Sequence, residues 1–388
     1  MRPMTVENKG TLLMCTLAHA VNHTQILIIA ALLPMFKEIY GLSYLMTEAI
    51  IAVYLLFYAL LNPLTGVLFQ GASKKLLVAM GKAVSGGALG VMAMVQGYVP
   101  LVATQALFGS AGGMYHPAGT SLLAERYGRE IRGRVMGVHG FGSSLGMILG
   151  PLLVAFFISS FDYRFALKVF AGVSVLFGLV FYYTVKEDGQ REKGPDIGSM
   201  LRKRRFRVVV AAFGLRESVF WGIKAFLPLY AVAVYNFSLP SAAALLAFLP
   251  VVGLLANLLG GFLADKYDRV QVTRVAVMLT AVSLGGFYFV TGEGAFYLLV
   301  GLTALGIYMT LPTFDSILAD ITPEDGYVKA YGAMYGVGFF LGALIPLGLG
   351  LLSDYVEPRA SFLLLSGVML LCYAVISMRK VFVHTREK

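Results

Sequence analysis

The sequence predicts an all-α membrane protein with twelve transmembrane helices in two pseudo-symmetric six-helix bundles. Three observations lead to this prediction. Of the 388 residues, 58% are hydrophobic and 13% are charged, whereas an average soluble domain is about 25% charged. The charged residues gather in short segments between apolar stretches of about 20 residues or more, the length that crosses a bilayer. The two halves of the chain also repeat each other.

This composition excludes two broad classes of protein. A disordered chain combines low hydrophobicity with high charge, the opposite of what is seen here. A water-soluble enzyme would have to expose the apolar excess to water. The two cysteines, Cys15 and Cys372, both lie in apolar stretches and predict neither a disulfide framework nor a metal site.

The twelve apolar stretches follow one another along the whole chain. They cover residues 10–36, 44–69, 76–97, 99–124, 134–159, 164–185, 207–235, 241–264, 271–291, 294–318, 328–352 and 359–382. The first stretch is too long for a removed signal peptide and lacks its small-residue cleavage site, so we expect it to remain as the first helix.

The basic residues predict the orientation in the membrane. Twelve spans place both termini on one side. Of the 31 Lys and Arg residues, two lie inside a span, Arg216 and Lys224, and only four lie in the segments of the opposite side. Those four are Lys37, Arg164, Lys168 and Arg359. The positive-inside rule therefore predicts a multi-pass protein of the cell membrane with both termini cytoplasmic.

The net charge of +10 is explained by this orientation, and nucleic acid is not an expected partner. The expected partners are a small-molecule substrate, protons and membrane lipid, and the chain is expected to be a monomer.

The most polar segment, residues 186–206, predicts a cytoplasmic linker between an N-terminal bundle, residues 1–185, and a C-terminal bundle, residues 207–388. The halves match at a constant offset of 195 residues: Pro117 matches Pro312, and Pro151 matches Pro346. Each half has an even number of spans and so keeps the same orientation. The halves are expected to be parallel repeats related by an axis along the membrane normal.

Two motifs resemble those of the major facilitator superfamily. The loop after the eighth stretch reads Gly261-Phe-Leu-Ala-Asp265-Lys266-Tyr-Asp-Arg269, which is similar to the loop motif of that family. The equivalent loop after the second stretch has Gln70 where the family usually has Asp. The fifth stretch carries Gly142, Gly146 and Gly150 followed by Pro151, similar to a glycine motif often linked to antiporters.

The resemblance implies the major facilitator fold, secondary active transport by alternating access, and a central cavity surrounded by spans 1, 4, 7 and 10. Asp265, with Lys266 and Arg269 in the same motif, is expected to cap and pair with basic groups at helix ends. Glycines spaced by four residues allow two helix backbones to come close. No Walker sequence occurs, so ATP is not the expected energy source.

A narrower resemblance lies in the fourth stretch. Gly112-Gly-Met-Tyr-His116-Pro117-Ala-Gly119, together with a histidine in the first span, is similar to the fosmidomycin-resistance branch of drug exporters. The first span departs from that branch, because His19 is followed by Asn22 and His23 where an acidic residue is expected.

The seventh span carries the densest group of candidate substrate residues. Ionisable side chains in a bilayer core are costly, and each is a functional candidate by default. Arg216, Phe220 and Lys224 follow i, i+4, i+8 spacing and share one helix face, which suits an anionic substrate. Trp221 is a further substrate-binding candidate. Glu217 points about 100° away and is expected either to carry a proton or to pair with a cation on a neighbouring helix. In the alternative, Arg216 and Glu217 only lock the bundle, and Lys224 reaches outward to the membrane interface.

The histidines and one aspartate are the candidate proton carriers. His19 and His23 share a face of the first span, and a histidine changes charge near neutral pH. His116 is instead a candidate substrate-binding residue, because it precedes Pro117, which breaks the helix and favours a polar, cavity-facing position. Asp315 is expected to carry a proton or to pair with Arg216. His139 is expected to be structural.

No metal or other cofactor is expected, because the pair His19 and His23 has no third ligand near in the sequence. Tyr54, Tyr58 and Asn62 either line a polar cavity or pack between helices. Glu48, near the outer end of the second span, is expected to be solvated.

The function expected from these observations is proton-coupled antiport that exports a small anionic or amphipathic drug-like compound. The alternative is an uptake symporter or exchanger for organic anions that uses Arg216 and Lys224 to bind a carboxylate or phosphate. A membrane enzyme or receptor is disfavoured, because the sequence shows no catalytic dyad and no soluble domain.

Overall fold

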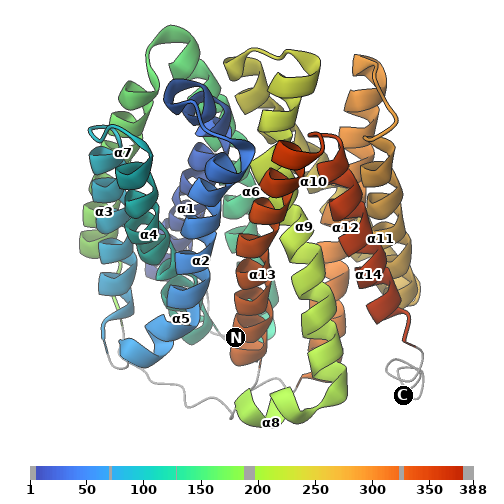
Figure 1. The fold of residues 1–388 in the computed structure, drawn as a ribbon. Helices are drawn as coiled ribbons and strands as arrows, with labels where there is room; N and C mark the ends of the chain where they lie inside the picture. The colour runs from blue at the N-terminus through green and yellow to red at the C-terminus, as the bar shows by residue number, and fades with distance from the viewer. Residues whose placement is uncertain (1–5, 70–71, 128, 188–196, 323–326, 379–388) are drawn as a thin grey trace. The chain divides into compact units, whose positions relative to one another are not determined.

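The computed structural model describes residues 6–69, 72–127, 129–187, 197–322 and 327–378, and every regular element in these ranges is a helix (Figure 1). The helices are α1 (Val6–Tyr40), α2 (Tyr44–Leu68), α3 (Lys74–Met92), α4 (Tyr98–Gly113), α5 (Tyr115–Arg126), α6 (Arg129–Ser160), α7 (Tyr163–Thr184), α8 (Ile197–Arg202), α9 (Arg204–Tyr235), α10 (Leu239–Lys266), α11 (Arg269–Gly286), α12 (Glu293–Ile321), α13 (Tyr327–Tyr355) and α14 (Ala360–Ile376).

Each of the twelve predicted spans coincides with one helix, except the fourth, which is divided into α4 and α5 at Met114. The division follows from Pro117, which cannot donate a backbone hydrogen bond to residue 113. The related Pro312 lies inside the continuous α12. The short α8 lies in the predicted linker, of which residues 188–196 lie outside the described ranges.

Most of these helices can cross a bilayer by length and composition. Within the described ranges, nine helices are both long and apolar enough: α1, α2, α3, α6, α7, α9, α10, α12 and α13. The apolar α14 is slightly shorter, at 17 residues. The chain is therefore a multi-pass membrane protein of α-helices.

Polar side chains fix several helix ends. Asp162 caps α7 by accepting a hydrogen bond from the Phe165 amide (2.6 Å). Asp268 caps α11 in the same way by accepting from the Gln271 amide (2.8 Å). The C-terminus of α9 is capped by Asn236. This residue has a left-handed backbone conformation (φ 55°), which asparagine tolerates better than most residues.

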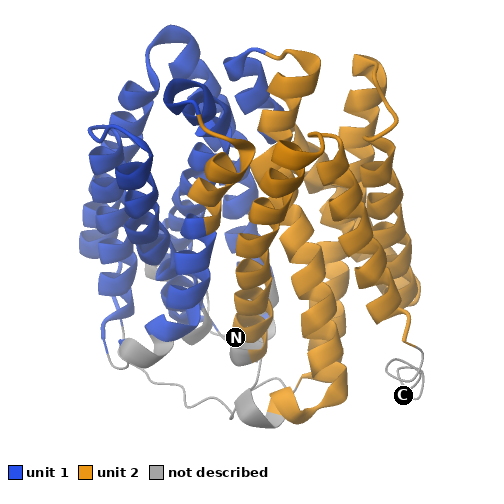
Figure 2. Cartoon of the chain, viewed as in Figure 1, with its two compact units in different colours: residues 1–41, 53–193, 238–247 blue, residues 42–52, 194–237, 248–388 orange. Residues whose placement is uncertain are grey.

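The described helices form two compact units, coloured separately in Figure 2. Unit 1 comprises residues 1–41, 53–193 and 238–247, and unit 2 comprises residues 42–52, 194–237 and 248–388. The same pairs of helices pack in each unit. In unit 1 these pairs are α1 with α6, α3 with α7 and α3 with α4. In unit 2 the related pairs are α9 with α13, α11 with α14 and α11 with α12. The two halves that resemble each other in sequence therefore also pack their corresponding helices in the same pairs.

Glycines set the distance between the paired helices. A Cβ atom on Gly142 or Gly146 of α6 would clash with the carbonyl oxygen of Thr16 or Ala20 of α1, so the two backbones lie in contact. In the related pair of unit 2, Gly338 and Gly342 of α13 instead leave room for side chains of α9. Those side chains belong to the candidate site.

Candidate functional site

One face of α9 presents two cations on either side of an aromatic ring, as the sequence predicts. The guanidinium carbon of Arg216 lies 4.6 Å from the centroid of the Phe220 ring. The ammonium nitrogen of Lys224 lies 3.3 Å from the same centroid. Arg216, Glu217, Phe220 and Lys224 are together called the α9 cation group. All four side chains are buried in the helical core.

Arg216 connects α9 to α12. Its guanidinium Nη1 pairs with the carboxylate of its neighbour Glu217. Its Nε donates to Thr310 Oγ1 (2.8 Å), and its Nη2 donates to the backbone carbonyl of Ile307 (2.8 Å). These bonds use three of the five N–H donors of the side chain. Glu217 is expected from the sequence to pair with a cation on a neighbouring helix, whereas the ion pair seen among the described residues is with Arg216 of its own helix. The Glu217 side chain packs against Gly338 of α13.

Lys224 points into the unit and not toward the membrane interface. Its ammonium lies 4.7 Å from the Trp221 ring centroid and 5.9 Å from that of Tyr308. The Trp221 ring packs on Phe339, at a centroid distance of 5.3 Å. Outward snorkelling of Lys224 is therefore excluded in this conformation, and the ammonium is surrounded by aromatic faces that attract cations.

Asp315 lies on α12, almost one turn beyond Pro312. Its Oδ1 atom is buried and has no hydrogen-bond partner among the described residues. The hydroxyl of Tyr331 donates to the backbone carbonyl of Asp315 (3.1 Å). Arg216 forms its ion pair with Glu217, and Asp315 is a half-buried carboxyl group in the same unit. A buried carboxylate oxygen without a hydrogen bond is costly, and such an atom gains by binding a proton.

Unit 1 brings four histidines together from three helices. His19 and His23 lie on α1, His116 on α5 and His139 on α6. The Nε2 atoms of His19 and His23 are 3.1 Å apart, and the His19 and His139 rings stack with centroids 4.3 Å apart. His19 Nδ1 is 2.9 Å from the backbone carbonyl of His139, to which it donates. The sequence predicts these residues as candidates, and the contact between them depends on the packing of α1, α5 and α6.

Lys82 is a buried cation that the sequence analysis does not single out as a candidate. It lies on α3, is 1% exposed, and donates to Asn22 Oδ1 (2.6 Å) and Gln25 Oε1 (3.5 Å) of α1. Its ammonium also lies 4.7 Å from the ring centroid of Tyr115. The distribution of basic residues predicts that Lys82 lies on the cytoplasmic side. Its burial could have been suspected, because Lys82 is the only charged residue of the stretch 76–97.

The three candidates on α2 have different environments. The Tyr58 hydroxyl accepts a hydrogen bond from Asn22 Nδ2 (3.0 Å) and so joins the polar network around Lys82. Tyr54 packs against Phe108, with ring centroids 5.0 Å apart, and against the glycines of α4. Asn62 is buried. Tyr58 also packs against Gly112 and Gly113 of α4, so packing between helices applies to both tyrosines, and a polar cavity along this stripe stays a prediction.

Glu48 is not solvated, contrary to expectation. Its side chain is fully buried in unit 2, and both carboxylate oxygens are without a hydrogen-bond partner among the described residues. The start of α2 is held by Asp354 of α13, whose carboxylate oxygens accept from the backbone amides of Tyr44 (2.8 Å) and Leu45 (2.9 Å). These bonds attach the first residues of α2 to α13 within unit 2.

The motif after α10 ties α10, α11 and α12 together at one end of unit 2. Asp268 is the N-cap of α11, and Asp265 lies exposed in the last turn of α10, where its expected pairing with basic groups stays a prediction. Arg269 forms an ion pair with Asp320 of α12. The Lys266 ammonium lies 5.6 Å from the Tyr267 ring centroid. Gln70, in the related loop of unit 1, lies outside the described residues.

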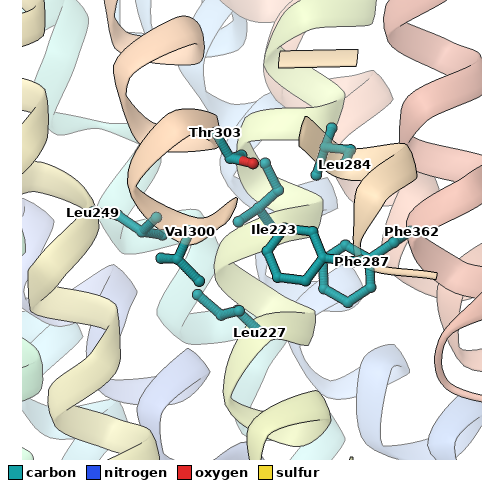
Figure 3. Close-up of a pocket in the computed structure, with 8 residues that line it drawn as sticks. All are labelled: Ile223, Leu227, Leu249, Leu284, Phe287, Val300, Thr303 and Phe362. Atoms are coloured by element: carbon teal, nitrogen blue, oxygen red, sulfur yellow. The ribbon is translucent and has the colours of Figure 1, made fainter. Parts of the chain in front are cut away.

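A small apolar pocket in unit 2 is separate from these polar groups. It lies between α9, α10, α11, α12 and α14, and Thr303 supplies its single hydroxyl group (Figure 3). The rings of Phe287 and Phe362 stack along one side, 4.3 Å apart. A pocket with this lining has no means of recognising a charged solute, and the candidate site remains the α9 cation group.

Comparison with known proteins places the sequence in one family. Residues 15–310 and 251–388 match the profile of the Major Facilitator Superfamily. The chain is 23% identical over 381 residues to the hexuronate transporter of Escherichia coli strain K12, covering 90% of this chain and 88% of that one. It is 24% identical over 271 residues to the galacturonate transporter of Dickeya chrysanthemi, covering 63% and 78%. It is 26% identical over 353 residues to a probable nitrate/nitrite antiporter of Thermus thermophilus, covering 80% and 78%.

The fold also matches solved structures. A bacterial homologue of the human lysosomal transporter Spinster, in an inward-facing and occupied conformation, superimposes with a TM-score of 0.86. The two sequences are 14% identical, and the match covers 99% of each chain. At this identity the likeness concerns the fold alone, which is the twelve-helix fold predicted from the sequence.

Proposed function

We propose that this chain, which belongs to the Major Facilitator Superfamily, takes up or exchanges small organic anions, with the carboxylate recognised by the α9 cation group. The membership makes it a transporter of small molecules in a membrane. The proposal concerns the substrate class, the direction of transport and the residues.

The relatives favour the anion alternative over drug export. Those quoted above are named for hexuronate, galacturonate and nitrate/nitrite, all of which are anions. None of these names supports efflux or the fosmidomycin-resistance branch, which was the main expectation from the fourth span. A hexuronate, a hydroxylated sugar acid, is the most specific substrate that they suggest.

The observation that carries the proposal is the charge of the α9 cation group. Arg216 and Lys224 place two cations on one buried face of α9, on either side of the Phe220 ring, and such a face attracts an anion. The three observed bonds use three of the five N–H donors of Arg216. The other two can donate hydrogen bonds to a planar carboxylate. The rings of Phe220 and Trp221 provide an apolar surface next to these donors. The group is closed in this conformation, and substrate access requires the opening step of an alternating-access cycle.

Protons are the proposed driving ion, and Asp315 is the proposed carrier. Its buried Oδ1 atom favours the protonated form while the site is closed, and opening to water allows the proton to leave. An anion that enters together with protons avoids a large charge movement against the membrane potential. The basic residues support an orientation with both termini in the cytoplasm.

Counterflow in proteoliposomes tests the substrate class directly. Vesicles that contain the purified protein are loaded with unlabelled galacturonate and diluted into labelled galacturonate, and accumulation of label is followed. We expect counterflow by the wild type and a loss of about tenfold or more in Arg216→Gln and Lys224→Gln, because a charge-assisted hydrogen bond contributes about 1.5–3 kcal/mol. Lys168→Gln, which removes an exposed cation of α7, is the matched control and should transport normally.

The export alternative makes a different prediction. A drug-sensitive bacterium that expresses the protein would gain resistance to small anionic antibiotics such as fosmidomycin, and the purified protein would show no counterflow with galacturonate. That combination of results would overturn uptake or exchange of organic anions as the function.

A further inference from the structure

Three of the five histidines of the chain converge in unit 1 and form a compact set of nitrogen ligands. His19 and His23 come from α1, and His116 comes from α5, about 100 positions later in the sequence. One ring nitrogen of each lies within 4.8 Å of those of the other two. Sequence reasoning dismissed a metal because a third ligand was missing near His19 and His23. The break between α4 and α5 places His116 in that position.

The distances within the set are close to those of a metal centre. Zinc binds histidine nitrogens at about 2.0–2.1 Å in a tetrahedral arrangement, which separates the nitrogens by about 3.3 Å. The Nε2 atoms of His19 and His23 are already 3.1 Å apart. The His116 ring stands nearly perpendicular to that of His19, at a centroid distance of 5.1 Å. The three ligand nitrogens lie within 4.8 Å of one another, so the set must contract before all three can bind one ion.

The surroundings of His19 match a recurrent feature of metal sites. A metal-bound histidine almost always donates its second ring N–H to a carbonyl or carboxylate, which fixes its orientation. His19 Nδ1 donates to the backbone carbonyl of His139 (2.9 Å), so that its Nε2 lone pair faces His23. The stacked His139 ring holds the plane of His19 from one side.

We propose that His19, His23 and His116 bind one divalent transition-metal ion, with zinc as the reference ion, through three imidazole nitrogens. Neutral imidazoles suit Zn²⁺, Cu²⁺ and Ni²⁺. Three protein ligands leave the fourth position open, as in catalytic zinc sites. We expect the open position to take water, hydroxide or a carboxylate, because these oxygen ligands complete zinc sites that have three protein ligands.

This site is independent of the proposed function, because metal binding is measured without substrate. Full-length protein is purified in detergent with a tag that contains no histidine, stripped of metal, and titrated with Zn²⁺ by calorimetry. We expect one zinc ion per chain. His19→Gln, His23→Gln and His116→Gln should each weaken binding more than about 100-fold, beyond the 10–100-fold loss typical of an outer-shell change.

His139→Gln is the matched control. It also removes one buried histidine, but it keeps the backbone carbonyl that orients His19, and it should retain one zinc ion per chain with an affinity within about tenfold of wild type. Cobalt(II) provides a second readout, because a three-histidine site gives visible absorption bands that a misfolded variant would not show. The proposal is overturned if the wild type binds no stoichiometric zinc, or if all four variants bind it equally.

Discussion

Asn22 illustrates at the scale of single residues how a buried charge depends on a neutral partner. Its amide oxygen accepts from the Lys82 ammonium, and its amide nitrogen donates to the Tyr58 hydroxyl. Asn22→Leu leaves the ammonium without its shortest hydrogen bond inside a bilayer core. We expect a loss of about 1–3 kcal/mol in the free energy of unfolding, visible as a lower melting temperature in detergent.

A second variant separates this cause from a general packing defect. Replacing both partners of a buried hydrogen bond by apolar groups is often nearly neutral. The double variant Asn22→Leu/Lys82→Leu should therefore be more stable than Asn22→Leu alone. A double variant that is less stable than the single one would show that Lys82 is not held in place by Asn22.

Asp315 supports a prediction about coupling. Asp315→Asn keeps the size of the side chain but cannot exchange a proton, so uptake driven by an imposed proton gradient should fall about tenfold or more. Counterflow, which needs no net proton movement, should persist. Normal gradient-driven uptake by Asp315→Asn in proteoliposomes would remove Asp315 from the coupling mechanism.

The candidate site could be predicted from the sequence only where one helix contains all its parts. Arg216, Phe220 and Lys224 lie at helical spacing, and their shared face follows from the period of the helix. The pairing of Arg216 with Glu217 could not be predicted from helical spacing, because neighbouring residues point about 100° apart and the position of Arg216 also depends on its bonds to α12. Lys82 and Glu48 were misjudged for a related reason. Their position along a span suggests contact with water, but both side chains are buried in the structure, Lys82 against amide groups of α1.

At the scale of helices, the contact between α1 and α6 depends on glycines without side chains. A Cβ atom at position 146 would clash with backbone atoms of Ala20 in α1. Backbone atoms inside a helix cannot move aside as a flexible side chain can. Gly146→Ala should therefore separate the two helices and lower the melting temperature, with a loss of about 1–3 kcal/mol as for other overpacked positions.

Gly140→Ala on the same helix is the control. A Cβ atom there meets nothing within 4 Å, and alanine is the better helix former. This variant should be as stable as the wild type or slightly more stable. Equal effects of the two substitutions would show that helix propensity, and not the contact with α1, governs the stability of α6.

The helices themselves were predictable, including the break in the fourth span. Long apolar stretches separated by charged loops determine the helical segments, and Pro117 indicates where α4 gives way to α5. The convergence of His116 with His19 and His23 was not predictable, because it depends on how α5 packs against α1. A single sequence does not show which helices lie next to each other in the fold.

At the scale of the whole molecule, the repeat gives two units with the same helix pairs and different polar contents. Unit 1 holds histidines, amides and Lys82, whereas unit 2 holds the α9 cation group and Asp315. The sequence resemblance identified the family correctly, but the narrower likeness to drug exporters rested on one short run around His116. The quoted relatives, which match 63% to 90% of the chain, favour organic anions instead.

The most direct test of anion recognition compares two sugars that differ only at one carbon. Galacturonate carries a carboxylate where galactose carries a hydroxymethyl group. A ligand that binds the folded protein raises its melting temperature. We expect galacturonate to raise the melting temperature of the purified wild type, galactose to leave it unchanged, and Arg216→Gln to abolish the difference. Equal shifts with both sugars, no shift with galacturonate, or an undiminished shift in Arg216→Gln would contradict recognition of the carboxylate by the α9 cation group.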